Sequence, residues 1–146
     1  MAKARIQIVE DEYILAKGIA TQLADMGYQV TGHASSGEQA VAMAKKDRPD
    51  LVLMDIVMPG EYDGVEAAAR IRTNLNIPVI FLTAHSDEET VQKAKLTEPH
   101  AYLLKPFTER ELYIAIEMAL HRARARKDAA GWNSSSIADE FDPDLL

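Results

Sequence analysis

The stretch that decides the fold is LVLMDIVMPG, residues 51–60. Four apolar residues lead directly to one carboxylate, Asp55, and the chain then meets Pro59 and Gly60, which favour a turn. A short run of apolar residues is typical of a strand that is buried on both faces, as in a parallel sheet covered by helices. The sequence therefore places an acidic side chain at the tip of a buried strand.

Short apolar runs alternate with helical patterns along the whole chain. We expect strands at residues 5–9, 28–34, 51–55, 78–83 and 101–104. We expect helices at residues 13–26, 35–46, 65–75, 87–96 and 108 to about 127. Repeated strand–helix units with right-handed crossovers predict an α/β fold, a doubly wound three-layer (βα)5 sandwich around a five-stranded parallel sheet.

Apolar stripes indicate which sides of the first and last helices face the core. In the first helix, the expected stripe consists of Ile14, Leu15, Ile19 and Leu23. In the last helix it consists of Leu112, Ile116, Ala119 and Leu120, and only alanines continue it beyond His121. We expect residues 1–127 to form one domain with an extended last helix, and residues 128–146 to form a flexible acidic tail.

The composition excludes several classes of protein. The 146 residues suit one domain, and no apolar run approaches the roughly 20 residues that span a bilayer. The chain has no cysteine, which excludes disulfides, thiolate nucleophiles and zinc–thiolate sites, and its four histidines lack metal-ligand spacing. The N-terminal segment shows no signal-peptide core. We therefore expect a cytoplasmic protein that does not bind membranes.

The net charge of −7 is concentrated at the C-terminal end. Residues 128–146 contain five acidic side chains and no Lys or Arg, so the rest of the chain has a net charge of −2. Because residues 1–127 are nearly neutral, we do not expect this part of the chain to bind nucleic acid directly. The one basic run, HRARARK at residues 121–127, is typical of a solvated helix end.

Polar side chains follow the carboxyl ends of four expected strands. They are Glu10 and Asp11, Asp55, Thr83 and Lys105. Taken singly, each is most often a helix cap or a solvated loop residue. In a parallel sheet, however, these ends lie at one edge, where ligands bind. Three carboxylates at one edge repel one another unless a cation neutralises them, which predicts a hard divalent cation such as Mg²⁺.

With a cation bound, the same residues support phosphoryl transfer. We expect the Asp55 carboxylate to be the nucleophile and to form an acyl phosphate. The cation and the Lys105 ammonium would neutralise the phosphoryl charge, and the Thr83 hydroxyl would donate a hydrogen bond to a phosphoryl oxygen. Asp55 is therefore predicted to accept a phosphoryl group.

Five motifs resemble those of the receiver domain of two-component response regulators. They are VEDE (9–12), LMDIVMPG (53–60), DG (63–64), FLTA (81–84) and YLLKPF (102–107), and the similarity covers residues 5 to about 121. The resemblance implies the strand order 2-1-3-4-5. It also implies a module that catalyses its own phosphorylation and dephosphorylation but is not a turnover enzyme. The phosphoryl donor would be a histidine kinase or a histidine phosphotransfer protein.

The resemblance assigns a role to each residue at the strand ends. Asp11 and Asp55 would bind Mg²⁺ (or Mn²⁺) together with the backbone carbonyl of Val57, and Glu10 would act on the metal mainly through water. Glu10 departs from the family, in which Asp is commoner at this position. Lys105 would bind the phosphoryl group on Asp55.

Further assignments concern switching. Thr83 is the switch hydroxyl, and Tyr102 is the switch aromatic, which turns inward when Thr83 moves towards the phosphoryl group. The Lys105–Pro106 peptide bond is expected to be cis. Val57 and His85 occupy the two positions that tune dephosphorylation, and the apolar Val57 predicts slow loss of phosphate because it cannot orient an attacking water.

Three rival functions are less consistent with the residues. An aspartate-nucleophile phosphatase needs a second acid two residues after the nucleophile, where this chain has Val57. A flavin- or nucleotide-binding sandwich is disfavoured by the acidic loop EDEYIL, residues 10–15, which repels a phosphate that lacks a metal. A phosphorylation-independent docking module would leave the set of Asp55, Thr83 and Lys105 without a purpose.

The predicted function is a phosphorylation-activated signalling switch. Phosphorylation would shift the balance between two states of the surface formed by the fourth helix, the fifth strand and the fifth helix, near residues 87–121. A downstream protein would bind that surface. The weak apolar seam beyond residue 120 favours a monomer or a weak, phosphorylation-dependent dimer.

Overall fold

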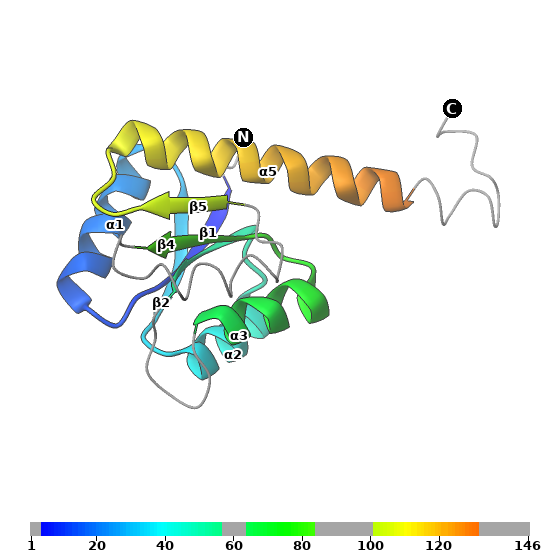
Figure 1. The fold of residues 1–146 in the computed structure, drawn as a ribbon, viewed down its shortest axis with the longest axis horizontal. Coiled ribbons are helices and arrows are strands. Elements are labelled where there is room, and N and C mark those ends of the chain that lie inside the picture. Colours follow the sequence, from blue (N-terminus) through cyan, green and yellow to red (C-terminus); the bar gives the residue numbers. More distant parts are fainter. Residues whose placement is uncertain (1–3, 57–63, 84–100, 132–146) are drawn as a thin grey trace.

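The computed structural model describes residues 4–56, 64–83 and 101–131. Its centre is a parallel sheet of five strands in the order β2-β1-β3-β4-β5 (Figure 1). The strands are β1 (Arg5–Val9), β2 (Gln29–Ala34), β3 (Leu51–Asp55), β4 (Val79–Thr83) and β5 (Ala101–Leu104). Both the predicted doubly wound α/β fold and the predicted strand order are confirmed.

Helices follow the strands as the sequence pattern predicts. They are α1 (Tyr13–Asp25), α2 (Gly37–Asp47), α3 (Gly64–Arg70) and α5 (Glu109–Gly131). The third helix continues without a break into η1 (Ile71–Leu75), a π-helical turn that ends at Asn76 in the left-handed conformation. The helix expected at 87–96 lies outside the described residues.

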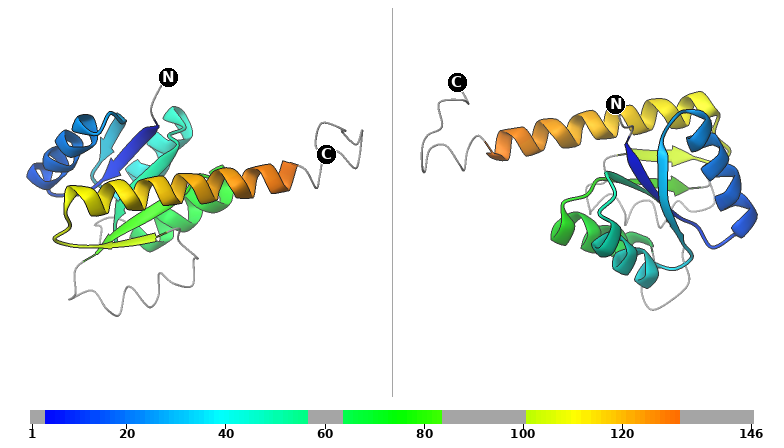
Figure 2. Two further views of the ribbon diagram at one scale, coloured as in Figure 1. Left: turned by 90° about the horizontal axis from the view of Figure 1, so that it is seen from above. Right: turned by 180° about the vertical axis from the view of Figure 1, so that it is seen from behind.

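The helices cover both faces of the sheet and form the outer layers of the sandwich (Figures 1 and 2). The structure has two hydrophobic cores, one on each face of the sheet. Successive side chains of β3 point to opposite faces and therefore pack alternately into one core and the other. Leu51 and Leu53 pack with residues of α1 and α5, whereas Val52 and Met54 pack with residues of α2 and α3. The strand LVLMD is thus buried on both sides, as its composition predicts.

The core-facing side of α1 differs from the prediction. Its buried residues are Ala16, Ile19 and Leu23, whereas Ile14 is 83% and Leu15 is 41% exposed. At about 100° per residue, Ile14 lies roughly 200° around the helix from Ala16, so it points away from the core. The small side chain of Ala16 occupies the core position that was expected for a larger apolar residue, and Ile14 and Leu15 lie at the surface.

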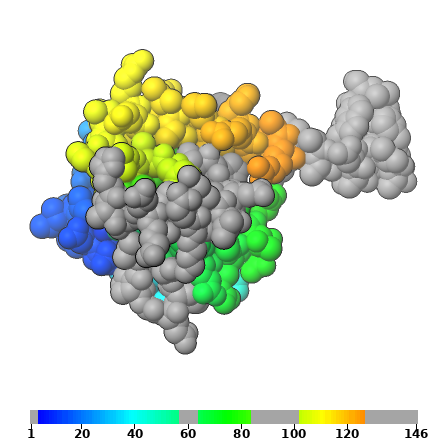
Figure 3. Space-filling model, in the orientation of Figure 1, coloured from blue at the N-terminus to red at the C-terminus, as the bar shows by residue number. Residues whose placement is uncertain are grey.

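The last helix is longer than predicted and ends at Gly131 rather than near Lys127. Alanine and arginine are strong helix formers, and no Gly or Pro interrupts the segment before Gly131. The four expected core residues, from Leu112 to Leu120, are buried as predicted. The end of α5 projects past the other described elements (Figure 1), and α5 forms the upper edge of the face seen in Figure 3. None of the helices in the described part of the chain could cross a membrane, being too short or too polar.

Gly18 in the interior of α1 is a site where stability can be gained. A Cβ atom added there would meet no heavy atom within 4 Å. We expect Gly18→Ala to raise the free energy of unfolding by about 0.5–1 kcal/mol, because glycine loses more backbone entropy than alanine when a helix forms. Urea unfolding followed by circular dichroism measures this change.

Gly32→Ala is the matched control, since its new Cβ would lie 2.5 Å from Cε of Met43 and no stabilisation is expected. Equal stabilisation by both substitutions would contradict the explanation.

Candidate functional site

The parallel strands bring all five predicted strand-end residues to one edge of the sheet. Glu10 and Asp11 follow β1, Asp55 is the last residue of β3, Thr83 is the last residue of β4, and Lys105 follows β5. This edge is the usual ligand site of an open parallel sheet, because all strands end there.

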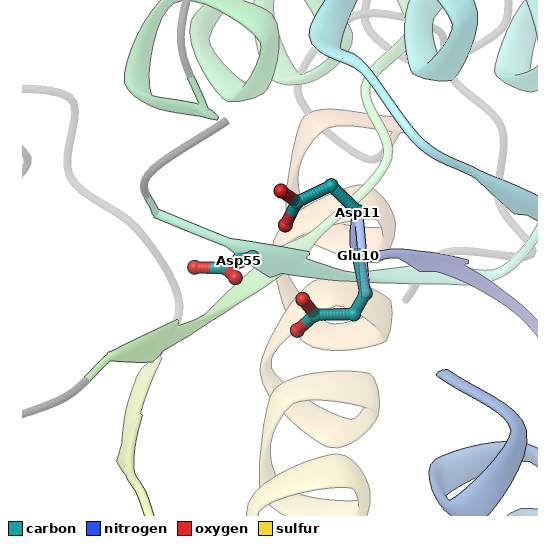
Figure 4. Close-up of side chains that lie close together, drawn as sticks. All are labelled: Glu10, Asp11 and Asp55. Atoms are coloured by element: carbon teal, nitrogen blue, oxygen red, sulfur yellow. The ribbon is translucent and has the colours of Figure 1, made fainter. Parts of the chain in front are cut away.

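Three carboxylates form the centre of the site. One carboxylate oxygen from each of Glu10, Asp11 and Asp55 lies within 4.8 Å of the other two. Figure 4 shows these side chains gathered at the ends of β1 and β3. Glu10 is 1% and Asp55 is 8% exposed, whereas Asp11 lies at the surface. A donor set made only of carboxylate oxygens fits a hard cation such as Mg²⁺ or Mn²⁺.

Lys105 neutralises part of this negative charge. Its Nζ donates to Glu10 Oε1 and to Asp55 Oδ2, and both N–O distances are 3.3 Å. Burial by itself lowers the pKa of the ammonium, but the charges of Asp55 and Glu10 outweigh burial and raise the pKa. Lys105 is therefore charged at neutral pH and bridges the two buried acids.

Both carboxylate oxygens of Glu10 accept hydrogen bonds. While Oε1 accepts from Lys105, Oε2 accepts from the backbone N–H of Glu12 at 3.1 Å. The pKa of the Glu10 carboxyl is raised from 4.5 to about 7: burial is the largest cause and the charge of Asp55 adds to it, while the Glu12 N–H and Lys105 oppose it. Asp11 has no hydrogen-bond or ion-pair partner among the described residues, so no cationic side chain in that part of the chain competes with a cation for its carboxylate.

Thr83 is buried at the end of β4 and is tied to the segment that carries Lys105. The backbone carbonyl of Thr83 accepts the N–H of Lys105 at 2.7 Å, and Thr83 lies opposite Leu104 in the ladder between β4 and β5. The hydroxyl and the ammonium thus start from neighbouring backbone positions at the same edge.

Tyr102 is partly buried and packs against the core on the α2 and α3 side of the sheet. Its ring stacks on Phe81 with a centroid distance of 6.0 Å and packs against the core beneath α2 and α3. Its hydroxyl is buried without a hydrogen-bond partner among the described residues, and burial raises its pKa. A buried hydroxyl that lacks a partner typically costs about 1–3 kcal/mol, which opposes the stacking and packing that hold the ring in this position.

A family comparison agrees with this geometry. The family profile described as the response regulator receiver domain matches residues 6–117. The chain belongs to this family. It is therefore the receiver domain of a response regulator, a signalling module rather than a turnover enzyme, which confirms the resemblance drawn from the motifs.

Relatives of this receiver domain are named as transcriptional regulators. It is 40% identical over 120 residues to the transcriptional regulatory protein PdtaR of Mycobacterium tuberculosis. The aligned stretch covers 82% of this chain and 58% of that relative. It is 36% identical over 118 residues to the uncharacterized transcriptional regulatory protein YrkP of Bacillus subtilis. That alignment covers 81% of this chain and 50% of the relative. The chain thus spans about half the length of the curated relatives it matches.

Solved receiver domains have the same fold. The signal receiver domain of a modulated diguanylate cyclase from Desulfovibrio desulfuricans G20 matches with a TM-score of 0.81 and 42% identity, over 85% of this chain and 98% of that chain. The N-terminal domain of a response regulator/sensory box/GGDEF protein from Carboxydothermus hydrogenoformans matches with a TM-score of 0.76 and 40% identity, over 84% and 98%.

Three assignments from the sequence concern the loops of this edge. The peptide bond between Lys105 and Pro106 is cis. Val57, assigned as a metal ligand through its carbonyl and as a rate-tuning position, lies outside the described residues, as does His85.

Gly64 holds a position in the site that the sequence motif did not explain. A Cβ atom on Gly64 would lie 2.3 Å from the carbonyl oxygen of Asp55 and 2.8 Å from that of Ile56. The start of α3 therefore packs directly on the end of β3, at a distance that only glycine permits. The DG motif, residues 63–64, was one of the motifs of the family resemblance, but linear spacing carries no information on this contact.

An apolar groove of about 520 Å³ opens beside the acid cluster, between α1 and the segment after β5. Its walls include Ile14, Leu15, Gly18, Pro106 and Phe107, and Glu10 and Lys105 of the acid cluster also line it. The two apolar residues of α1 that do not enter the core thus line a groove that leads to the site.

The raised pKa of Glu10 predicts a pH-dependent stability of the metal-free domain. Between pH 4.5 and about 7 the folded state holds a proton that the unfolded state has lost, so the stability that this proton provides falls as the pH rises. We expect this loss to reach at most about 3 kcal/mol. Glu10→Gln should remove it, because an amide does not ionise.

Denaturant unfolding in EDTA at pH 5 and pH 8 measures this difference. Glu12→Gln is the control, since Glu12 is exposed and contacts Glu10 through its backbone N–H only. The wild type and Glu10→Gln should diverge as the pH rises, and parallel pH profiles would refute the assignment.

Proposed function

We propose that this receiver domain is switched by phosphorylation of Asp55, with the phosphoryl group taken from a phosphohistidine. The observation that carries the proposal is the bridge from Lys105 to both Glu10 and Asp55 inside a cluster of three carboxylates. Such a cluster attracts a divalent cation, and a cation beside Lys105 suits a phosphoryl group, which carries negative charge on its oxygens.

Each residue of the site is proposed to have a separate role in the phosphoryl transfer. A bound Mg²⁺ or Mn²⁺ supplies charge neutralisation, and Asp11, Asp55 and the carbonyl of Val57 would hold it, with Glu10 acting through water. An oxygen of Asp55 forms a bond to phosphorus while the P–N bond of the donor breaks, and the electron pair passes to the imidazole nitrogen. Lys105 then pairs with a phosphoryl oxygen, and the Thr83 hydroxyl donates to another.

Switching is proposed to follow from the movement of Thr83 towards the phosphoryl group. Tyr102 lies on the neighbouring strand, and its hydroxyl, which has no hydrogen-bond partner among the described residues, disfavours the present position of the ring. A small change in interaction energy near Thr83 can therefore shift the population between two positions of the ring. The face predicted from the sequence near residues 87–121, which includes β5 and the first half of α5, would transmit this shift to a downstream protein.

The lifetime of the acyl phosphate is proposed to be long. Self-dephosphorylation needs a water in line with the phosphoryl group, and a polar side chain near the site can orient it. Val57 is apolar and offers no hydrogen bond for this purpose. The domain would therefore remain phosphorylated until a partner removes the phosphoryl group.

The donor is proposed to dock in the groove beside α1. Its walls are apolar, and Ile14 would be left exposed to water without a partner. Glu10 and Lys105 also line the groove and Lys105 contacts Asp55, so a histidine on a docked helix would approach the proposed nucleophile. An amphipathic helix of a histidine kinase or phosphotransfer protein fits such a groove.

Intact mass after incubation with Mg²⁺ and acetyl phosphate tests the chemistry of Asp55. We expect a gain of about 80 Da, one phosphoryl group, in the wild type, because the cation and Lys105 neutralise the incoming charge. Asp55→Asn and a sample treated with EDTA should show no gain. A gain in Asp55→Asn would assign the acceptor elsewhere, and no gain combined with no binding of beryllium fluoride would favour a phosphorylation-independent docking module.

A second experiment separates docking from chemistry. Ile14→Glu should slow phosphotransfer from a phosphorylated histidine kinase or phosphotransfer protein by about tenfold or more, because it puts a charge in the apolar groove. Phosphorylation by acetyl phosphate should be unchanged, since this small donor needs no docking surface.

Met118→Glu is the matched control for that experiment, because Met118 is also an exposed apolar residue but lies on α5, outside the groove. Equal slowing by both substitutions, or no slowing by Ile14→Glu, would rule out the groove as the docking site.

A further inference from the structure

His33 contacts the backbone next to the acid cluster. It lies in β2, and its Nε2 is 2.7 Å from the carbonyl oxygen of Glu10. The backbone ladder between β1 and β2 pairs its last residues at Val9 and Ala34, and the N–H of Glu10 then donates to the carbonyl of Ala34 at 3.0 Å. The His33 side chain thus adds one more hydrogen bond between β1 and β2, to the Glu10 carbonyl, just past the last residue pair of the backbone ladder.

The imidazole ring is itself held in place by α1. The rings of Tyr13 and His33 are in tilted contact, with centroids 6.3 Å apart, and the ammonium of Lys17 lies 5.9 Å from the centroid of Tyr13. Tyr13 is the first residue of α1. His33 therefore contacts both sides of the turn that carries the acidic pair, the Glu10 carbonyl before it and Tyr13 after it.

The position of Asp11 depends on this turn. The Asp11 side chain is exposed and has no partner among the described residues, so its contacts do not orient it. Its direction follows from the peptide unit between Glu10 and Asp11. The carbonyl of that unit is the group that accepts a hydrogen bond from His33.

We propose that His33 is a positioning residue of the metal site: its imidazole fixes the Glu10–Asp11 peptide unit so that the Asp11 carboxylate faces Asp55. This inference rests on the proposed metal-dependent function and adds a residue that does not touch the metal. Groups that orient metal ligands commonly change affinity by about 10–100-fold when they are removed.

Direct titration with Mg²⁺, and with Mn²⁺ as a second probe, tests the proposal by isothermal calorimetry. His33→Phe keeps a ring of similar size against Tyr13 but has no N–H to donate. We expect its dissociation constant for either metal to rise about tenfold or more. His33→Gln retains an N–H donor of similar reach and should restore most of the affinity.

Thr31→Val is the matched control. Thr31 lies two residues earlier in the same strand, and its hydroxyl donates to the carbonyl of Ile6 in β1 at 3.5 Å, away from the acid cluster. Removal of that hydroxyl should leave the metal affinity unchanged. Thermal unfolding is measured for every variant, and His33→Leu replaces His33→Phe if the phenylalanine variant does not fold.

A kinetic readout distinguishes positioning from a loss of folded protein. With acetyl phosphate as donor, the Mg²⁺ concentration for half-maximal rate should rise in His33→Phe, while the rate at saturating Mg²⁺ stays within about twofold of the wild type. A merely structural role would lower the plateau or the unfolding temperature without changing the metal dependence.

Unchanged metal affinity in folded His33→Phe, or equal weakening in Thr31→Val, would overturn this inference while the wild type still binds metal. Failure of the wild type to bind either metal would instead overturn the proposed metal site, and the inference with it.

Discussion

Two carboxylates buried side by side are the constraint on which the rest of this structure depends. Glu10 and Asp55 come from adjacent strands and have little access to water, so their charges repel one another at short range. Lys105 is the one cationic group among the described residues that contacts both. An ion bridge of this kind compensates the two buried negative charges in the free domain and holds the ends of β1, β3 and β5 together.

The fold supplies this arrangement because every strand of a parallel sheet ends at the same edge. The strands contribute acids, a hydroxyl and an ammonium from positions far apart in the chain, while both cores hold the strand register rigid. Gly64 brings the start of α3 onto the end of β3, and His33 extends the bonding of β1 past its last ladder pair. The site is thus formed by tightly packed backbone, and the exposed Asp11 has no hydrogen-bond or ion-pair partner among the described residues.

The strand-end residues were predictable because short apolar runs in the local sequence identify the strands. The polar residues that end or follow these runs are then the candidates for the site. The family motifs then identified Asp55, Thr83 and Lys105 as one set, and the structure places them at one edge. The core side of α1 was predicted incorrectly for Ile14 and Leu15, because an apolar stripe does not distinguish a face packed on the sheet from one that lines a groove.

The sequence by itself determined the fold class, the strand order through the family motifs, and the residues at the strand ends, because hydrophobic period and strand polarity are local properties. Only the tertiary structure decided which atoms meet. His33 and Glu10 are 23 residues apart, and Lys105 and Glu10 are 95 apart, so their contacts depend on strand register. The raised pKa of Glu10 and the apolar groove arise in the same way, since burial and surface shape are set by segments that are distant in the chain.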